Sequence, residues 1–252
     1  MTITGEPCWI HLFTTDVDTA VRFYGGLFGW SVGEPSEEHG GYRMFLCDDE
    51  PVAGLMPNHT AEPDVWEVFL QTPDIARTVR RARDRGAVIA TGVMAVPGLG
   101  SMTSLVDPAG ALVGAWQPDG FSGFATRAAV GAPGWFETFT TSYREAVAFY
   151  EEVFGWETHV VSDTPDFRYT TLGLDQEARA GIMDGSSFLG DEPSRWNVYL
   201  QVEDTDETVG EAIEAGGRLT SAAADTPYGR IAELQDPTGV VFRVIGPDLE
   251  AS

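Results

Sequence analysis

The sequence contains no lysine, only two cysteines and no apolar run of membrane-spanning length. Its fifteen basic residues are all arginine and face 39 acidic residues, so the formal net charge is −24. Such a polyanion repels phosphate backbones and anionic lipid, and we expect neither nucleic acid nor a membrane as a partner. Cys8 and Cys47 have no metal-type spacing and are too few to predict a disulfide framework. The N-terminus has no basic region followed by an apolar stretch, so we expect a cytoplasmic protein.

The sequence does contain an internal repeat. AVRFYGGLFGW (20–30) returns as AVAFYEEVFGW (146–156), 126 positions later, with seven of eleven residues identical. This step is half of the 252-residue chain, which indicates two similar folded units. An apolar content of 43% and an aromatic content of 11% are enough for two cores. We therefore predict domain 1 over residues 1–120, a linker over 121–132 and domain 2 over 133–252.

Helix signals mark the start and the end of the repeated stretch. Apolar residues at helical spacing follow Asp16, a residue type that caps helices. SYRE (142–145) is a capping-box sequence in front of the matching helix. Gly29 and Gly155 are placed to adopt the left-handed conformation that ends a helix. Alternating apolar residues before and after these helices predict strands.

A second round of the same pattern follows within each half. VWEVFLQTPDIARTVRRARDRG (65–86) and RWNVYLQVEDTDETVGEAIEAGG (195–217) each predict a strand, a capped helix and a glycine stop. Each half closes on an Asp-Pro-x-Gly turn before its last strand, at 107–110 and 236–239. We predict an α+β fold of four βαβββ modules over about 7–58, 64–118, 134–185 and 194–247.

Paired modules, the FY…FGW helix end and the DPxG turn together resemble the vicinal oxygen chelate superfamily. That superfamily includes glyoxalase I, extradiol dioxygenases, fosfomycin-resistance proteins and bleomycin-binding proteins. The resemblance covers nearly the whole chain, once per domain, and is greatest to two-domain actinobacterial members. It implies that modules pair into two glyoxalase-like domains whose curved mixed sheets enclose a cavity. It also implies a divalent ion, held in that cavity by side chains of the first and last strands.

The metal positions of this superfamily carry unsuitable residues here. They correspond to Trp9, Glu67 and Gly114 in domain 1, and to Trp135, Asn197 and Arg243 in domain 2. Indole, glycine and guanidinium do not bind a divalent cation, so we expect no metal or other cofactor. His11 lies on the same strand face as Trp9, and a His11–Glu67 pair is the alternative site for a weakly bound divalent metal. Two ligands are fewer than catalytic zinc sites use.

Four polar residues are the candidate catalytic residues: His11, Glu67, Glu137 and Arg243. His11 is either an acid or base with a pKa near neutral or a hydrogen-bonded structural residue. Glu67, desolvated beside an aromatic wall, is expected to have a raised pKa that suits proton transfer. Glu137 and Arg243 are expected to point into domain 2, where they pair with each other or Arg243 holds a carboxylate or enolate of a ligand.

The candidate ligand-binding residues are Trp9, Phe13, Trp135, Asn197, Tyr199, Met56, Met183 and Tyr228. Trp9 and Trp135 either stack on an aromatic ligand or belong to the core. Met56 and Met183 are either flexible walls of the cavity or core residues. Tyr228 lies in a glycine-containing segment that either covers the mouth of the cavity or forms an ordinary turn.

Three functions follow from these expectations. The first is an enzyme that tailors a hydrophobic or aromatic metabolite in a metal-poor cavity, by an isomerase, cyclase or lyase type of reaction. The second is a non-catalytic binding or resistance protein of the bleomycin-resistance type. The third is a metal-dependent glyoxalase or dioxygenase. In each case the partner is a small molecule, and the chain acts as a monomer that is an internal pseudo-dimer or as a homodimer.

Overall fold

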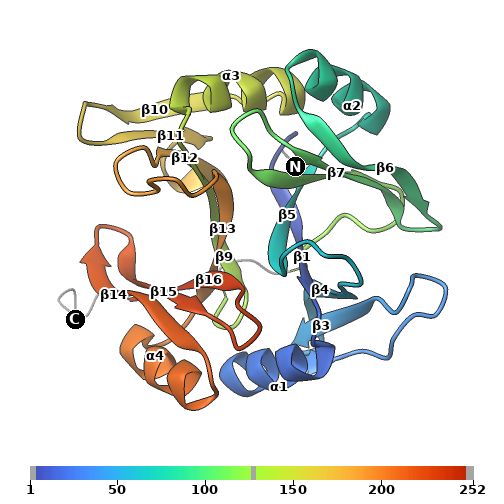
Figure 1. Ribbon diagram of the computed structural model, residues 1–252, viewed down its shortest axis with the longest axis vertical. Helices are drawn as coiled ribbons and strands as arrows, with labels where there is room; N and C mark the ends of the chain where they lie inside the picture. Colours follow the sequence, from blue (N-terminus) through green and yellow to red (C-terminus); the bar gives the residue numbers. More distant parts are fainter. Residues whose placement is uncertain (1–3, 126–128, 248–252) are drawn as a thin grey trace. The chain divides into compact units, whose positions relative to one another are not determined.

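The computed structural model describes residues 4–125 and 129–247 and shows the predicted four modules (Figure 1). Module 1 consists of β1 (Pro7–Thr14), α1 (Val17–Phe28), β2 (Ser31–Val32), β3 (Arg43–Cys47) and β4 (Glu50–Pro57). Module 2 consists of β5 (Val65–Gln71), α2 (Ile75–Asp84), β6 (Val88–Val96), β7 (Gly100–Val106) and β8 (Leu112–Pro118). Part of the predicted linker, 126–128, lies outside the described residues.

The second half of the chain repeats this order. Module 3 consists of β9 (Pro133–Thr140), α3 (Tyr143–Phe154), β10 (Thr158–Asp163), β11 (Arg168–Leu172), the short 3₁₀ helix η1 (Asp175–Glu177) and β12 (Ala180–Asp184). Module 4 consists of β13 (Arg195–Gln201), α4 (Thr205–Glu214), β14 (Arg218–Thr226), β15 (Gly229–Gln235) and β16 (Val241–Gly246). The α+β fold class is therefore confirmed. No helix in the described part of the chain is long and apolar enough to span a membrane.

The strands form two open eight-stranded mixed sheets. Their strand orders are β2-β3-β4-β1-β5-β8-β7-β6 and β10-β11-β12-β9-β13-β16-β15-β14. Within each module the first strand pairs in parallel with the last, and the remaining pairs are antiparallel. The parallel register places Phe69 opposite Gly114 in module 2 and Tyr199 opposite Arg243 in module 4. The first and last strands therefore pair in the same register within module 2 and within module 4.

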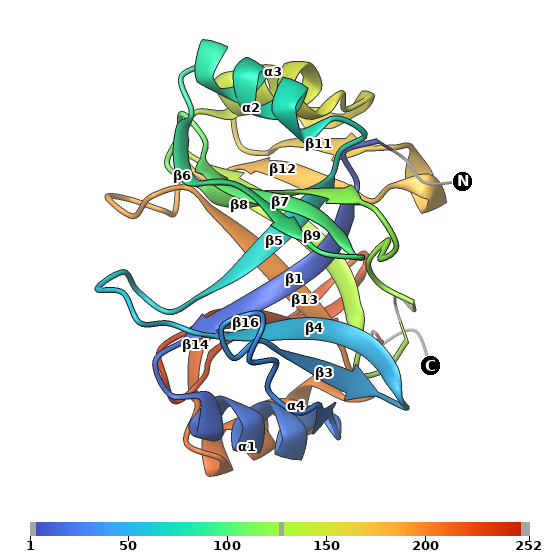
Figure 2. The ribbon, with the colours of Figure 1, turned by 90° about the vertical axis from the view of Figure 1, so that its right-hand side faces the viewer.

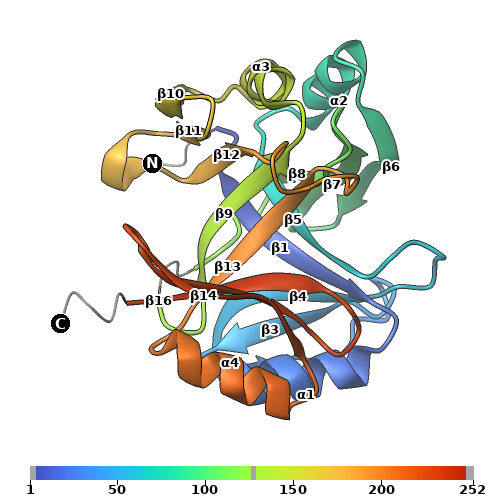
Figure 3. The same cartoon turned by 60° about the vertical axis from the view of Figure 1, so that its left-hand side comes forward.

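The compact units of the chain do not follow the two sheets. Unit 1 contains the chain up to Trp9, Glu67–Gly123 and Phe136–Trp196, and unit 2 contains Ile10–Trp66, Phe124–Trp135 and the chain from Asn197 onward. Unit 1 thus combines modules 2 and 3, with α2 packed beside α3 (Figure 2). Unit 2 combines modules 1 and 4, with α1 packed beside α4 (Figure 3). The domain bounds inferred from the sequence stay a prediction.

Most helix signals act as predicted. The carboxylates of Asp16 and Asp74 accept hydrogen bonds from the backbone N–H groups three residues further on, at 3.0 and 2.9 Å. Asp204 accepts from two N–H groups at the start of α4. Gly29 and Gly155 follow α1 and α3 with φ of +67° and +73°, the left-handed conformation that glycine tolerates best.

The capping box predicted at 142–145 is wrong. Ser142 occupies the N-cap position of α3, but its side chain makes no capping hydrogen bond. Its backbone N–H instead donates to the hydroxyl of Thr140 at 3.1 Å. The turn that leads into α3 is therefore stabilised by the threonine at the end of β9.

The two repeated motifs meet inside each unit. In unit 2 the Tyr24 hydroxyl donates to Asp236 at 3.0 Å and accepts from the Trp66 indole at 3.0 Å. In unit 1 the Tyr150 hydroxyl donates to Asp107 at 3.0 Å and accepts from the Trp196 indole at 2.9 Å. All these groups are buried, so the hydrogen bonds satisfy polar atoms that would otherwise cost free energy.

Each aspartate of these networks also accepts hydrogen bonds from backbone N–H groups of the DPxG turn that it begins. Asp107 accepts from the backbone N–H groups of Ala109 and Ala111, and Asp236 does the same two and four residues further on. The DPxG turn and the FY helix therefore stabilise each other between modules that come from different halves of the chain. Burial, followed by the nearby aspartate, raises the pKa of Tyr24 and of Tyr150 well above the ordinary tyrosine value.

Candidate functional site

A buried carboxyl group is the main chemical feature of unit 1. Glu67 lies in β5 between apolar neighbours and is 1% exposed. Burial raises its pKa to about 8, against the opposing effect of a hydrogen bond with Ser104. Its Oε1 atom has no hydrogen-bond partner among the described residues. Glu67 is therefore mainly neutral at neutral pH, which confirms the predicted raised pKa, and one of its oxygens is unused.

The strands next to this carboxyl group leave no room for a metal-ligating side chain at Gly114. Ser104 of β7 pairs with Gly114 of β8, and Gly114 in turn lies opposite Phe69 of β5. A Cβ atom at Gly114 would overlap the ring of Phe69. The last-strand position of module 2 is therefore closed by an aromatic ring, and glycine is required there for steric reasons.

Trp9 belongs to an aromatic cluster of the same unit. It is 3% exposed and meets the edge of Phe121 with ring centroids 4.9 Å apart. Phe121 also packs against Trp116 at 6.2 Å, and the Trp116 indole donates to the Phe121 carbonyl at 2.8 Å. Trp9 thus has an aromatic packing partner of its own, and its contact with a ligand stays a prediction.

Module 3 contributes a second buried carboxylate to unit 1. Glu137 of β9 is 4% exposed and lies opposite Gly181 of β12. A Cβ atom at Gly181 would overlap the hydroxyl of Tyr169, which fills the space beside this glycine. Met183, two residues further along β12, is half-buried and pairs with Tyr169 of β11.

Module 1 places His11 among aromatic rings in unit 2. The imidazole lies 5.2 Å from the ring of Tyr42 and 5.9 Å from that of Phe13, measured between centroids. Burial lowers the pKa of His11 to about 3, so of its two alternatives the acid or base with a near-neutral pKa is wrong. His11 is a neutral imidazole at physiological pH and a weak base. Half-buried Met56 of β4 lies opposite Phe13.

Module 4 holds an ion pair at the position equivalent to Gly114. Two guanidinium nitrogens of Arg243 bond Glu233 Oε2 at 2.7 and 3.2 Å, and a third bonds the Tyr199 hydroxyl at 3.1 Å. The guanidinium also lies 5.4 Å from the centre of the Tyr199 ring, a cation–π distance. The Thr220 hydroxyl donates to the other oxygen of Glu233 at 2.9 Å. Arg243 is thus held rigidly, and a pairing with Glu137 stays a prediction.

Modules 2 and 4 have the same strand pairing but different side chains at equivalent positions. Alignment of their first, third and last paired strands makes four positions equivalent: Glu67 and Asn197, Phe69 and Tyr199, Ser104 and Glu233, Gly114 and Arg243. The pairing is the same in both, because Ser104 opposes Gly114 just as Glu233 opposes Arg243. Module 2 holds a neutral carboxyl group, whereas module 4 holds a buried amide and a paired charge.

The remaining predicted residues lie in separate places. Trp135 is half-buried in β9, within unit 2, and Asn197 is buried in β13. Tyr228 lies in the turn between β14 and β15 and is 71% exposed. Its side chain is presented to solvent, so a role in ligand binding stays a prediction.

The comparisons with known proteins agree with this architecture. The family model of the glyoxalase/bleomycin resistance protein/dioxygenase superfamily matches residues 8–114, and that of a glyoxalase-like domain matches 136–245. A protein called putative glyoxylase CFP32, from Mycobacterium tuberculosis, is 31% identical over 96% of this chain and 95% of its own length. The chain belongs to the glyoxalase/bleomycin resistance protein/dioxygenase superfamily. Anthracycline biosynthesis protein DnrV of Streptomyces peucetius is 32% identical over 96% of this chain and 93% of its own.

Solved structures of the superfamily share the fold. The Mn(II)-bound glyoxalase from Novosphingobium aromaticivorans has a TM-score of 0.67 at 18% identity, covering 99% of this chain and 86% of that one. The 2,3-dioxygenase LapB from Pseudomonas sp. KL28 has a TM-score of 0.67 at 12% identity, covering 98% and 94%. At these identities the likeness shows the fold alone.

The metal positions of the superfamily do not fit a divalent cation in this member. Gly114 has no side chain, and Phe69 occupies the space in which one would lie. Arg243 places a cation at the corresponding position of module 4 and is already paired with Glu233. Across residues 4–125 and 129–247 no three His, Cys, Asp or Glu side chains are grouped so that they could hold a metal ion. These donor sets do not match the three protein ligands typical of catalytic metal sites.

Several site residues escaped the sequence reasoning. Ser104 and Glu233 occupy equivalent positions in β7 and β15, so alignment of the modules would have found them as a pair. Tyr42 and Tyr169 lie in strands that the sequence predicts, but nothing in the sequence shows that their hydroxyls fill the space beside a glycine. Phe121 falls in the predicted linker, where a packing partner of Trp9 was not expected.

Proposed function

We propose that this superfamily member is an enzyme that moves a proton on a hydrophobic or aromatic small molecule, with Glu67 as the acid–base group and without a bound metal. The observation that carries the proposal is the state of Glu67: buried, neutral at neutral pH and with one oxygen unused. A buried carboxyl group with a pKa near the working pH is suited to both giving and taking a proton. Module 4 has an amide, which cannot exchange a proton in this way, at the equivalent position.

The reaction that fits this group best is a keto–enol type of isomerisation. Glu67 gives its proton to a carbonyl oxygen of the ligand, and the carboxylate that results removes a proton from the neighbouring carbon. The C–H electron pair becomes the new double bond, the carbonyl becomes an enol, and Glu67 ends as it began. No oxidant, reductant or second substrate is needed. Ser104 orients the carboxyl group, since it is hydrogen-bonded to it.

The substrate class follows from the aromatic surroundings and from the relatives. Aromatic side chains gather around Trp9 in unit 1, the unit that also contains Glu67. Such walls favour planar apolar ligands. One relative is named an anthracycline biosynthesis protein, which supports a fused-ring aromatic metabolite and a role in secondary metabolism for this chain as well.

The test compares wild-type protein with Glu67→Gln, using an anthracycline aglycone as the probe and product analysis by mass spectrometry. We expect turnover by the wild type and a loss of about 100-fold or more in the variant, with binding retained. Glu214→Gln, an exposed change in α4, is the matched control and should keep full turnover. Turnover by Glu67→Gln at the wild-type rate would refute the role of Glu67.

A metal inventory separates this proposal from metal-dependent chemistry. The purified protein is analysed for elements, and turnover is repeated after treatment with a chelator. We expect turnover to survive, because the superfamily's metal positions do not fit an ion. A stoichiometric divalent metal whose removal abolishes turnover would overturn the proposal.

The second candidate is a binding protein that sequesters an aromatic compound. The contact of Trp9 with Phe121 in unit 1 favours it, because rigid rings are sufficient for binding. In that case the aglycone binds and leaves unchanged, Trp9→Ala weakens binding, and Glu67→Gln has little effect.

A further inference from the structure

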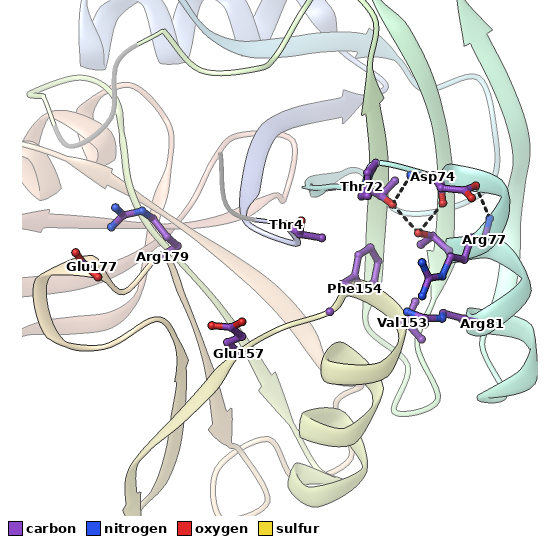
Figure 4. Close-up of a pocket in the computed structure, with 13 residues that line it drawn as sticks. Thr4, Thr72, Asp74, Arg77, Arg81, Val153, Phe154, Glu157, Glu177 and Arg179 are labelled. Carbon is purple, nitrogen blue, oxygen red and sulfur yellow. Dashed lines mark hydrogen bonds between the residues drawn. The ribbon is translucent and has the colours of Figure 1, made fainter. Parts of the chain in front are cut away.

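A cleft on the helical side of unit 1 is separate from the buried residues described above. Its volume is about 770 Å³, and it lies among α2, the C-terminal end of α3 and the segment that leads to β12 (Figure 4). Arg77 and Arg81 of α2 form one side, Val153 and Phe154 supply apolar surface, and Arg179 lies across the cleft. A volume of this size accommodates a ligand of about nucleotide size.

The two arginines of α2 are available to a ligand. They are four residues apart and so share one face of the helix. The side chain of Arg77 makes no hydrogen bond or ion pair with any residue that the structure describes, and is exposed. Arg81 uses Nη1 on the Glu152 carbonyl at 3.0 Å, and its remaining N–H groups have no partner within 4–125 and 129–247. Two neighbouring guanidinium groups without carboxylate partners are typical of an anion-binding site.

The internal repeat shows that the fold does not need these charges. Alignment of α2 with α4 places Arg77 at the position of Glu207 and Arg81 at that of Glu211. Both helices nonetheless form and pack on the strands of their own modules. Five of the fifteen arginines of this strongly acidic chain fall within residues 77–85. A reversal of charge at equivalent positions, concentrated beside a cleft, therefore points to a binding role.

We propose that this cleft binds a small organic anion whose phosphate or carboxylate group is held by Arg77 and Arg81. The rest of the ligand lies along Phe154 and extends toward Glu157 and Glu177, which favour hydroxyl or amino groups at that end. Arg179 lies on that side, with its Nε 3.8 Å from a carboxylate oxygen of Glu6. Arg77, Arg81 and the capping carboxylate of Asp74 thus line the cleft on the α2 side, and Glu157 and Glu177 line it together with Arg179 on the other.

The test is isothermal titration of the full chain, at low ionic strength, with adenosine 5′-monophosphate, citrate and neutral adenosine. The double variant Arg77→Glu/Arg81→Glu copies the residues that α4 already carries at these positions. The double variant Arg80→Glu/Arg83→Glu is the matched control, because it makes the same change of charge on the same helix at residues that do not line the cleft. Circular dichroism and the thermal midpoint check that both variants fold.

We expect one or both anions to bind wild type and control, and adenosine to bind neither. The cleft variant should bind at least about tenfold more weakly, because two charge-assisted contacts are lost. Binding of the nucleotide alone identifies phosphate as the preferred group, and binding of citrate alone identifies carboxylate. The proposal fails if no anion binds the wild type, or if both double variants weaken binding equally, since the effect would then be one of net charge.

Discussion

The buried carboxyl group of Glu67 makes the stability of the protein depend on pH in a predictable direction. The pKa of Glu67 rises from 4.5 to about 8 on folding. Below the unfolded value both states hold the proton, so the titration of Glu67 does not change the stability. As the pH rises between the two values, the unfolded chain releases its proton while the folded chain keeps it, so folding loses about 1.4 kcal/mol per pH unit. Above the folded value the cost is constant at about 5 kcal/mol.

Glu67→Gln removes this dependence, because an amide of nearly the same shape is neutral at every pH. The glutamine amide can also keep a hydrogen bond with Ser104. Asn197, at the equivalent position of module 4, shows that a buried amide is compatible with this strand position. We expect the variant to be slightly more stable than wild type near pH 5 and about 4–5 kcal/mol more stable near pH 8. Urea unfolding at several pH values across this range measures the difference in unfolding free energy between variant and wild type. The diagnostic quantity is the slope of this difference against pH.

The matched control is Glu214→Gln, an exposed carboxylate change on α4. It should unfold like wild type at each pH, so any slope specific to Glu67→Gln reports desolvation. A difference between Glu67→Gln and wild type that does not change with pH would refute the reasoning. So would a wild type that becomes more stable relative to the variant as the pH rises. Either result would mean that Glu67 is ionised in the folded protein and that its proposed role as a proton donor is wrong.

Three further changes test the packing. Tyr150→Phe leaves the buried Asp107 carboxylate and its indole neighbour without their shared hydroxyl, and should lower the free energy of unfolding by about 1–3 kcal/mol in urea; an unchanged midpoint would contradict the network. Gly114→Ala should cost about 1–3 kcal/mol, because the new methyl group overlaps a ring of β5, and a neutral effect would show that the ring can move. Arg243→Ala leaves Glu233 largely buried without its cation and should cost about 2–4 kcal/mol, which Arg243→Ala/Glu233→Gln should partly restore.

The fold was largely predictable because its signals are local. Apolar spacing, an aspartate before each of three helices and a glycine after α1 and α3 depend on neighbours within one turn. The contacts between motifs are different. Tyr24 and Asp236 each stand out in the sequence, but they are 212 residues apart and their hydrogen bond exists only once modules from opposite halves pack together. Periodicity shows which face a residue takes and does not show which residue meets it.

The site was predicted in part for the same reason. A carboxylate in an otherwise apolar strand is desolvated wherever the strand is buried, so the raised pKa of Glu67 follows from β5 alone. The pKa of His11 depends on which groups surround it: rings of Phe13 and Tyr42 pack around the imidazole and burial disfavours its charged form. Glu233 was missed because its partnership with Arg243 depends on the register between β15 and β16, which the sequence does not show.

The contacts of Arg243 in module 4 limit how its charge could act on a ligand. A guanidinium acts as an electrostatic substitute for a metal only if its charge is available to a ligand. Arg243 already makes two hydrogen bonds to Glu233 and one to Tyr199, so the pair carries no net charge and each partner is fixed. We therefore expect module 4 to contribute a rigid polar wall, and module 2 to contribute the proton that moves in the proposed reaction. If Arg243 instead held the charge of an enolate, Arg243→Lys would slow turnover more than Glu67→Gln; we expect the reverse order.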